Sequence, residues 1–233
     1  MRLLRSALQN IFFFVTIIVV GVLCLPGAYI SRSFARDRVR FAAHTLLWSL
    51  RVFSSLDYKV IGGRHISKNP ALYVSQHQSM WETAALYLLV PNGVFIVKQS
   101  LINLPVAGVY LRRSGFIGVD RSNKSILRGL IKKCMAQKKE GFNIILFPEG
   151  HRIPYGEQAH LNPSFAIIAQ EAGLPVIPIT HNSGLFFPRR SFFKKRGVIE
   201  MEVHRPLSMQ IRPIEMVAEL KTIYYGKQAV GEE

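Results

Sequence analysis

A histidine and a glutamate stand five positions apart in the stretch Val74 to Leu89, at His77 and Glu82. A histidine beside a carboxylate suits general-base chemistry, because the carboxylate accepts one ring N–H and leaves the other nitrogen to take a proton. On a regular helix, however, residues five apart point about 140° away from each other. The pair can therefore work together only if the chain bends between the two residues.

The local sequence provides such a bend. Residues 71–76 (ALYVSQ) predict a strand, and Ser79 is a favourable N-cap for a helix that begins at Met80. His77 then lies in the turn, and Glu82 lies in the first turn of the helix. The same spacing also has a purely structural interpretation, because Ser79 and Glu82 form the pattern of a capping box. The residues of this stretch leave both interpretations open.

Two further motifs follow predicted strands. Arg121 comes directly after the run GFIGVD and before a predicted helix, and the run FNIILF is followed by Glu149, Gly150 and Arg152. In α/β sheets, ligands gather at the carboxyl ends of the strands. An arginine beside a helix N-terminus suits a phosphate monoester, because its paired N–H groups and the helix dipole both favour an anion. Together these motifs predict a site with a base and an anion clamp, and without metal ligands.

The elements that must position these residues follow from the hydrophobic pattern. Short β-rich runs predict strands at residues 57–63, 71–76, 93–98, 115–120, 142–147, 174–180 and 198–203. Helical patterns lie between several of them, at residues 79–91, 122–141 and 164–173, and Gly141 is expected to end the second of these helices. This alternation predicts an α/β fold with a single mixed, largely parallel sheet flanked by helices.

The N-terminal segment has a different character. No residue from Ser6 to Ser31 is charged, and the chain from Ile11 to Leu25 is almost wholly apolar. Such a stretch is long enough to span a bilayer or to lie in one face of it. Arg2 and Arg5 also fit a signal peptide, but no small-x-small cleavage site follows them, so an uncleaved membrane segment is expected.

A second apolar stretch runs from Phe41 to Leu56. It either pairs with the first stretch as a hairpin on the same membrane face or forms a core helix. Arginines are more numerous after the first stretch than before it, which predicts that the remainder of the chain stays cytoplasmic. We therefore divide the chain into a membrane-anchoring helical segment, residues 1–55, and an α/β domain, residues 56–233.

The net charge of +16 favours an anionic partner, which is a nucleic acid, a lipid surface or a phosphorylated substrate. No zinc spacing, recognition helix or aromatic stacking motif supports a nucleic acid, so none is expected. The basic loop, residues 184–197 (GLFFPRRSFFKKRG), interleaves phenylalanines with cations. This pattern indicates either a segment that enters a lipid headgroup layer or a solvated loop whose phenylalanines pack inward.

The ordered set of motifs resembles the glycerolipid acyltransferase family, and in particular its bacterial 1-acyl-glycerol-3-phosphate acyltransferases. That family is marked by a histidine, four residues and an aspartate; by Gly-Phe-Ile with a later arginine; by Phe-Pro-Glu-Gly-Thr-Arg; and by a proline-rich strand. The matching residues here are His77 with Glu82, Gly115-Phe116-Ile117 with Arg121, Phe147-Pro148-Glu149-Gly150 with Arg152, and Leu174 to Pro178. The likeness covers about Leu56 to Leu207, and an ordered set is far more specific than one motif.

The resemblance implies transfer of a fatty acyl group from acyl-CoA or an acylated carrier protein to the sn-2 hydroxyl of lysophosphatidic acid. No cofactor and no metal are implied. His77 would be the general base and Glu82 would orient it. The implied substrate-binding residues are Lys98, Gly115, Arg121, Glu149, Gly150 and Arg152. The implied location is the bacterial inner membrane, with the site on its cytoplasmic face and membrane lipids as partners.

Three departures from the family pattern leave alternatives open. Glu82 stands where the family has aspartate, His151 stands where threonine is usual, and HLNPSF replaces a segment that commonly carries a basic residue and a glycine. One alternative is an acyltransferase that acts on another lysolipid. The other is a membrane protein of the same fold that has lost the chemistry.

Overall fold

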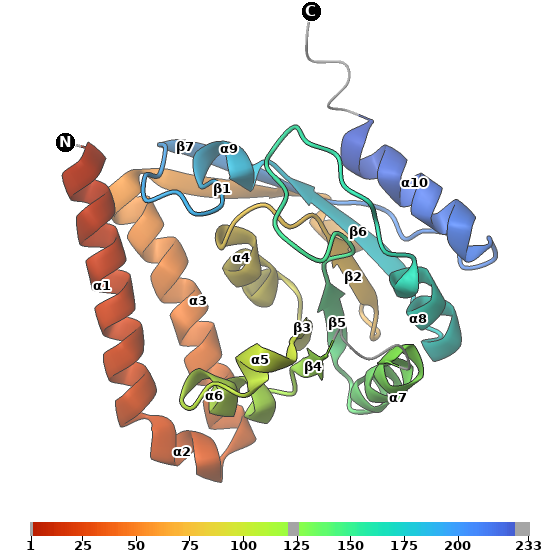
Figure 1. Cartoon of the computed structure of the whole chain (residues 1–233), viewed down its shortest axis with the longest axis horizontal. Coiled ribbons are helices and arrows are strands. Elements are labelled where there is room, and N and C mark those ends of the chain that lie inside the picture. Colours follow the sequence, from red (N-terminus) through yellow and green to blue (C-terminus); the bar gives the residue numbers. More distant parts are fainter. Residues whose placement is uncertain (1, 121–125, 227–233) are drawn as a thin grey trace, which may run out of the picture.

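The structure of the chain is a computed structural model in which residues 2–120 and 126–226 are described. The strands are β1 (Leu56–Ile61), β2 (Leu72–Ser75), β3 (Gly93–Lys98), β4 (Ile117–Val119), β5 (Asn143–Leu146), β6 (Val176–His181) and β7 (Gly197–Val203). The helices are α1 (Arg2–Leu23), α2 (Leu25–Ile30), α3 (Arg32–Ser54), α4 (Trp81–Leu89), α5 (Gln99–Ile102), α6 (Ala107–Arg113), α7 (Ile126–Lys139), α8 (Ser164–Ala172), α9 (Ser183–Phe186) and α10 (Pro213–Tyr225). Figure 1 shows their arrangement.

The seven strands form one sheet in the order β1-β7-β6-β2-β5-β3-β4. All seven predicted strands are therefore confirmed. Among the described pairs, β6 and β7 run antiparallel and the other neighbours run parallel, which confirms the mixed, largely parallel sheet. β6, β2 and β5 are neighbours near its centre, so their carboxyl ends lie together at one edge.

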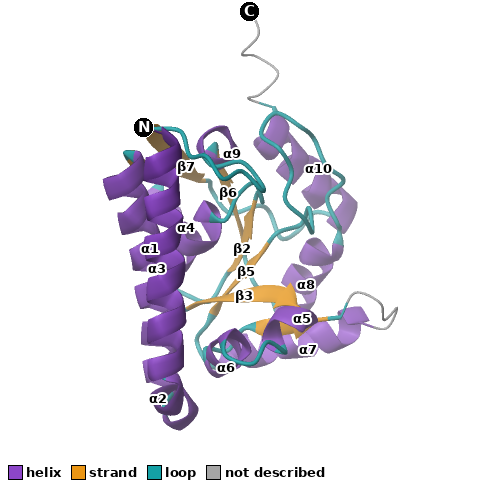
Figure 2. Ribbon diagram, turned by 60° about the vertical axis from the view of Figure 1, so that its left-hand side comes forward, coloured by secondary structure: helices purple, strands orange, loops and turns teal. Residues whose placement is uncertain are grey.

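Alternation along the central strands divides the core into two layers. Tyr73 of β2 and Ile145 of β5 face the cluster that contains the buried side chains of α3 and α4. Their neighbours Leu72 and Ile144 face the cluster that contains those of α7, α8 and α10. Successive residues of a strand point to opposite faces, so each central strand contributes to both layers. Figure 2 shows the sheet between these two groups of helices.

Three glycines, Gly115, Gly141 and Gly173, end helices in the same way. Gly141 has φ +81° and follows α7, where Gly141 N donates to Lys138 O and the next residue, Phe142, donates to Gln137 O. Gly115 has φ +90° and ends α6 with the equivalent pair of bonds. This is the Schellman arrangement, in which a residue without a Cβ adopts the left-handed conformation at low cost. The predicted stop of α7 at Gly141 is confirmed.

The two apolar N-terminal stretches lie side by side as α1 and α3 (Figures 1 and 2). Gln9 Nε2 donates to Ser49 Oγ over 3.2 Å, and the rings of Phe12 and Trp48 are 5.4 Å apart. On its other side α3 packs on α4, where Leu50 is fully buried. The second stretch is thus a hairpin partner of α1 and a core helix at once. The two alternatives do not exclude each other, because different faces of α3 serve them.

The outer face of α1 is apolar and exposed. The helix is long and apolar enough from Leu4 to Leu23 to cross a membrane, judged by length and composition alone. Ile11 and Ile18 are 61% and 63% exposed, whereas an apolar helix of a soluble core is covered. This suggests membrane association. The division of the chain at residues 55 and 56 stays a prediction.

The basic loop turns some of its aromatic side chains inward and leaves others exposed, and its entry into a lipid headgroup layer stays a prediction. Phe187 is buried, whereas Phe192 and Phe193 are exposed. Lys194 is buried among them; its Nζ donates to Asn10 Oδ1 of α1 over 2.6 Å and lies 4.8 Å from the Phe187 ring centroid. Burial lowers the pKa of Lys194 from 10.5 to about 8. One phenylalanine pair is therefore available for an outside contact, and one of the cations is occupied within the protein.

Candidate active site

His77 lies in the turn between β2 and α4, at the carboxyl edge of the central strands. The predicted helix start is wrong by one residue, because α4 begins at Trp81 and Met80 is its N-cap. Ser79 nevertheless accepts a hydrogen bond from Trp81 N over 3.0 Å. The physical reason is that the Ser79 hydroxyl also donates to Glu82, which holds it one residue outside the helix.

The turn brings His77 and Glu82 into contact. His77 Nδ1 is 2.7 Å from Glu82 Oε1, and the Glu82 side chain is fully buried. An ionised carboxylate only accepts hydrogen bonds, so the ring proton is placed on Nδ1. The donors to this carboxylate are His77 Nδ1, Gln78 N, Ser79 N and the hydroxyls of Ser79 and Ser183. Glu82 thus accepts the Ser79 N–H as a capping box would and contacts the histidine as well.

These donors keep the buried Glu82 ionised. Burial acts to raise its pKa, but hydrogen bonds from His77 and Ser79 and the nearby rings of His181 and His77 outweigh it. The pKa of Glu82 falls from 4.5 to about 2. A carboxylate that is charged, fully bonded and shielded from water can fix an imidazole and stabilise its protonated form.

A second carboxylate holds the backbone of the same turn. Glu149 Oε2 accepts the His77 N–H over 2.6 Å, and His77 O accepts the Ile153 N–H over 2.7 Å. Tyr225 donates its hydroxyl to Glu149 Oε1 over 3.0 Å. Burial raises the pKa of Glu149 from 4.5 to about 7, against the lowering effect of the hydrogen bonds that Glu149 accepts from His77 N and Tyr225. The segment after β5 therefore fixes the main chain of His77, while Glu82 fixes its ring.

One face and one nitrogen of the His77 ring define the reactive side. The ring stacks on Phe147 with centroids 4.2 Å apart, and 18% of the His77 side chain is exposed. In the part of the chain that the structure describes, no hydrogen bond engages Nε2. A nitrogen in this position can take a proton from a hydroxyl group that approaches from outside.

Two buried residues at the end of β6 are not predicted from the sequence: His181 is the last residue of the strand, and Ser183 follows it. His181 donates Nε2–H to Gln76 O over 3.0 Å, and Ser183 donates its hydroxyl to Glu82 Oε2 over 3.1 Å. Burial lowers the pKa of His181, against the opposing effect of the Glu82 charge. The available signal is positional, because both residues lie at the carboxyl end of β6, the strand beside β2, at the same edge of the sheet as His77.

The predicted substrate-binding residues are partly gathered at this edge. Lys98 ends β3 and is exposed. Arg152 is half-buried, and its Nε is a buried donor with no acceptor in the described part of the chain. Gly150 has φ +72° in the turn after β5. Gly115 serves the end of α6, and Arg121 lies outside the described residues. Substrate binding by all of them stays a prediction.

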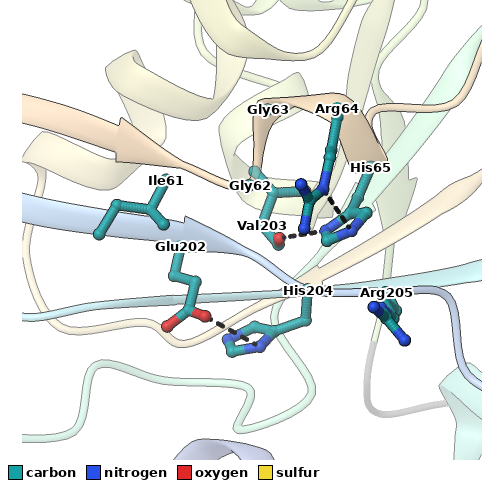
Figure 3. A pocket seen from close by; sticks show the side chains of 9 residues that line it. All are labelled: Ile61, Gly62, Gly63, Arg64, His65, Glu202, Val203, His204 and Arg205. Atoms are coloured by element: carbon teal, nitrogen blue, oxygen red, sulfur yellow. Dashed lines mark hydrogen bonds and ion pairs between the residues drawn. The ribbon is translucent and has the colours of Figure 1, made fainter.

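A separate hollow of about 550 Å³ lies where β1 and β7 end (Figure 3). Arg64 and His65 line it from the turn after β1, and His204 and Arg205 line it from the segment after β7. His65 Nδ1 is 2.9 Å from Val203 O. Because β7 runs antiparallel to β6, this hollow lies toward the opposite edge of the sheet from His77. It does not include the candidate catalytic residues.

Comparisons with known proteins agree with this architecture. The family model described as Acyltransferase matches residues 57–182. The chain is 32% identical over 190 residues to a 1-acyl-sn-glycerol-3-phosphate acyltransferase of Pseudomonas aeruginosa, covering 79% of this chain and 74% of that protein. It is 27% identical over 216 residues to a chloroplastic 1-acyl-sn-glycerol-3-phosphate acyltransferase of Arabidopsis thaliana. That match covers 88% of this chain but 60% of the plant protein, which is less than two thirds of its length.

A solved structure has the same fold. The 1-acyl-sn-glycerophosphate acyltransferase of Thermotoga maritima superposes with a TM-score of 0.78 at 22% sequence identity. The match covers 98% of this chain and 97% of that chain, so it includes α1 to α3 as well as the sheet. At this level of identity the likeness establishes the fold.

Proposed function

The chain belongs to the acyltransferase family, and from that premise we propose that it transfers a fatty acyl group from a thioester to the sn-2 hydroxyl of 1-acyl-glycerol-3-phosphate. The product is phosphatidic acid. The observation that carries the proposal is the contact between His77 Nδ1 and the buried Glu82 carboxylate at the carboxyl edge of the sheet. The acceptor is proposed because the similar proteins of Pseudomonas aeruginosa and Arabidopsis thaliana are 1-acyl-sn-glycerol-3-phosphate acyltransferases.

In the proposed reaction, His77 Nε2 removes the proton from the acceptor hydroxyl as its oxygen attacks the thioester carbonyl carbon. Glu82 keeps the other ring proton on Nδ1 and stabilises the imidazolium that forms. The tetrahedral intermediate collapses, the carbon–sulfur bond breaks, and His77 returns the proton to the departing thiolate. Positioned base catalysis contributes roughly 10²–10⁴-fold, so binding and orientation supply the rest of the rate enhancement. The proposal requires no cofactor and no metal.

The phosphate of the acceptor is assigned to the cations beside this turn. The buried Arg152 Nε lacks an acceptor in the described residues, and a buried donor without a partner costs free energy that an anion would recover. Lys98, at the end of β3, is the proposed second cation. Arg121, Gly115, Glu149 and Gly150 complete the proposed binding set. The acyl donor is acyl-CoA or an acylated carrier protein.

The proposed location is the bacterial inner membrane, with the site on its cytoplasmic face. The exposed apolar face of α1 supports a lipid contact. The basic loop supports a membrane on the same side of the molecule as the candidate active site. Its Arg189 Nη1 donates to Arg152 O over 3.4 Å, and its Lys194 contacts Asn10 of α1. The same loop therefore contacts both the lipid-facing helix and the segment that is proposed to bind phosphate.

A panel of lysolipid acceptors tests the proposed function. The purified full chain is supplied with labelled acyl-CoA or acylated carrier protein, together with lysophosphatidic acid, another lysophospholipid or a monoacylglycerol. We expect labelled phosphatidic acid from the wild type and roughly 10²–10⁴-fold slower formation from His77→Ala. Faster turnover of another lysolipid would replace the proposed acceptor. Absence of transfer with both donors and all acceptors would contradict the enzyme assignment.

The substitution Arg152→Lys tests the phosphate contact. Lysine keeps the charge but loses the planar pair of donors. We expect kcat/KM for lysophosphatidic acid to fall roughly tenfold to a hundredfold, since a charge-assisted hydrogen bond is worth about 1.5–3 kcal/mol. The loss should be smaller for a monoacylglycerol, which lacks the phosphate. Arg205→Lys, at the opposite edge of the sheet, is the matched control. Equal losses for both acceptors would mean that Arg152 supports the fold.

A further inference from the structure

The last described helix, α10, ends against the turn that carries His77. The Tyr225 hydroxyl donates to Glu149 Oε1 over 3.0 Å and accepts the Ala159 N–H over 3.2 Å. Gln76, the residue before His77, donates its Nε2–H to Tyr224 O over 3.2 Å. The end of a helix about 150 residues downstream thus contacts the candidate active site twice.

The Tyr225 contact determines how Glu149 is held. The Glu149 side chain is buried, and its two oxygens have different partners: Oε1 accepts from Tyr225 and Oε2 accepts from His77 N. Without a donor to Oε1, the carboxylate would keep a buried charge with one oxygen unpaired. It would then rotate or take up a proton, and either change loosens the bond to the His77 backbone.

We propose that Tyr225 is a positioning residue for the proposed acyl transfer: its hydroxyl fixes the Glu149 carboxylate, which in turn fixes the main chain of His77. This inference rests on the proposed function of His77 as the base. Tyr225 itself is not placed in contact with substrate. Its effect reaches the reaction through two hydrogen bonds, from Tyr225 to Glu149 and from His77 N to Glu149.

The titratable groups that act on Glu149 set the expected pH dependence. Burial raises its pKa to about 7, the hydrogen bonds from His77 and Tyr225 lower it, and the charge of Glu82 raises it. The phenols of Tyr225 and Tyr224 also face Glu149, and the pKa of each is raised, so both stay protonated near neutral pH. Removing the Tyr225 hydroxyl therefore raises the pKa of Glu149 further and extends its protonated range to higher pH.

The chain offers a matched control one residue away. The Tyr224 hydroxyl is also buried, but it has no hydrogen-bond partner in the described residues. Tyr224→Phe and Tyr225→Phe delete the same atom from adjacent residues of α10. The two variants share any general effect of losing a buried hydroxyl. They differ in the hydrogen bond to Glu149, which Tyr225 donates and Tyr224 does not.

The experiment compares wild type, Tyr225→Phe and Tyr224→Phe as full chains in detergent, with kcat and KM measured from pH 5.5 to pH 9. For Tyr225→Phe we expect kcat at pH 6.5 to fall about tenfold, KM for lysophosphatidic acid to stay within about twofold, and the acid limb of kcat to move to higher pH. Tyr224→Phe should stay within about twofold throughout. Equal behaviour of the two variants, or a loss confined to KM, would overturn the proposal.

A spectroscopic readout separates this proposal from the proposed function. In protein labelled with ¹⁵N-histidine, the His77 amide is assigned by its loss in His77→Ala and followed against pH. Its resonance should shift near pH 7 in the wild type and at higher pH in Tyr225→Phe, with Tyr224→Phe matching the wild type. This result would uphold the link even if the protein proved inactive as a transferase. An unchanged titration in Tyr225→Phe would refute the link even in an active enzyme.

Discussion

The turn that carries His77 and the outer face of α1 are built in opposite ways. In the turn, the Glu82 carboxylate is fully buried and both of its oxygens accept hydrogen bonds from the protein. On α1, large apolar side chains such as Ile11 and Ile18 are more than half exposed, and the uncharged segment offers no ion pairs. The first arrangement fixes the geometry of polar groups internally. The exposed apolar face of α1 has no such internal partners and is stabilised only where an apolar medium covers it.

The basic loop joins these two regions. Lys194 donates to Asn10 of α1, and Arg189 donates to the carbonyl oxygen of Arg152. Under the proposed function, a lipid acceptor passes from a membrane around α1 to the polar turn, and this loop contacts both regions. The comparison therefore predicts separable defects. Changes on α1 should affect membrane binding without affecting the fold, and changes in the turn should affect the fold without affecting membrane binding.

The largest effect is expected from placing charges on the outer face of α1. Ile11→Glu combined with Ile18→Glu should lower binding to lipid vesicles more than a hundredfold, because each buried isoleucine contributes about 1.5–3 kcal/mol and a charge is strongly disfavoured in lipid. Vesicle flotation of the full chain measures the binding. The melting temperature should change little, since neither side chain packs in the core.

The matched control for α1 is Val198→Glu combined with Ile214→Glu, which places the same charges on exposed apolar residues of β7 and α10. This control should bind vesicles like the wild type. If the α1 variant and the control bound equally well, α1 would not be the membrane-facing element.

The next effect concerns the stability of the polar turn in acid. The pKa of Glu82 is about 2 in the folded protein and 4.5 when unperturbed, so its contribution is complete above pH 4.5 and is lost as the pH falls toward 2. This shift corresponds to roughly 3 kcal/mol. The free energy of unfolding should therefore decrease more steeply below pH 4.5 in the wild type than in Glu82→Gln.

Urea unfolding in detergent at several pH values checks this difference. Glu219→Gln, on the exposed side of α10, is the control and should keep the acid dependence of the wild type. Parallel curves for wild type and Glu82→Gln would mean that the Glu82 charge is not held by the network around it.

The smallest effect is expected at the basic loop. Phe192→Ser combined with Phe193→Ser removes the two exposed phenylalanines and leaves Phe187 in place. Binding of the full chain to anionic vesicles should fall about tenfold, and the remaining binding should weaken further with added salt, because the neighbouring cations would still attract anionic headgroups. Unchanged binding to both anionic and neutral vesicles would remove this loop from the membrane contact.

The strands could be predicted because they depend on local pattern. The local spacing of His77 and Glu82 allows their contact but leaves the capping box open as well, and only the order of the motifs and the resemblance to the family favour the contact. Apolar runs bounded by turn residues indicate strands, and the motif order indicates which strand ends carry the site. The helix start at Trp81 could not be placed to the residue, since the Ser79 hydroxyl is drawn toward Glu82. Local propensity does not include such a side-chain contact.

The contacts that complete the site depend on long-range topology. Tyr225 and Glu149 are 76 residues apart, and Ser183 and Glu82 are 101 residues apart, so no local spacing indicates either pair. Helix α10 is likewise not predicted from the sequence, although Pro213 at its start and the spacing of Met216 and Leu220 are helix signals. Without that helix, the partner of Glu149 cannot be identified.

A double-mutant cycle on His77 and Glu82 tests the central claim most directly. The turnover number kcat for lysophosphatidic acid is measured for wild type, His77→Ala, Glu82→Gln and the double variant, each checked for folding by circular dichroism. If Glu82 acts by orienting His77, Glu82→Gln lowers kcat and the double variant is no slower than His77→Ala, because two residues that act as a unit are lost only once. If the two losses multiply, or if Glu82→Gln keeps the wild-type kcat, Glu82 supports the turn alone and the pair is not an acid–base dyad.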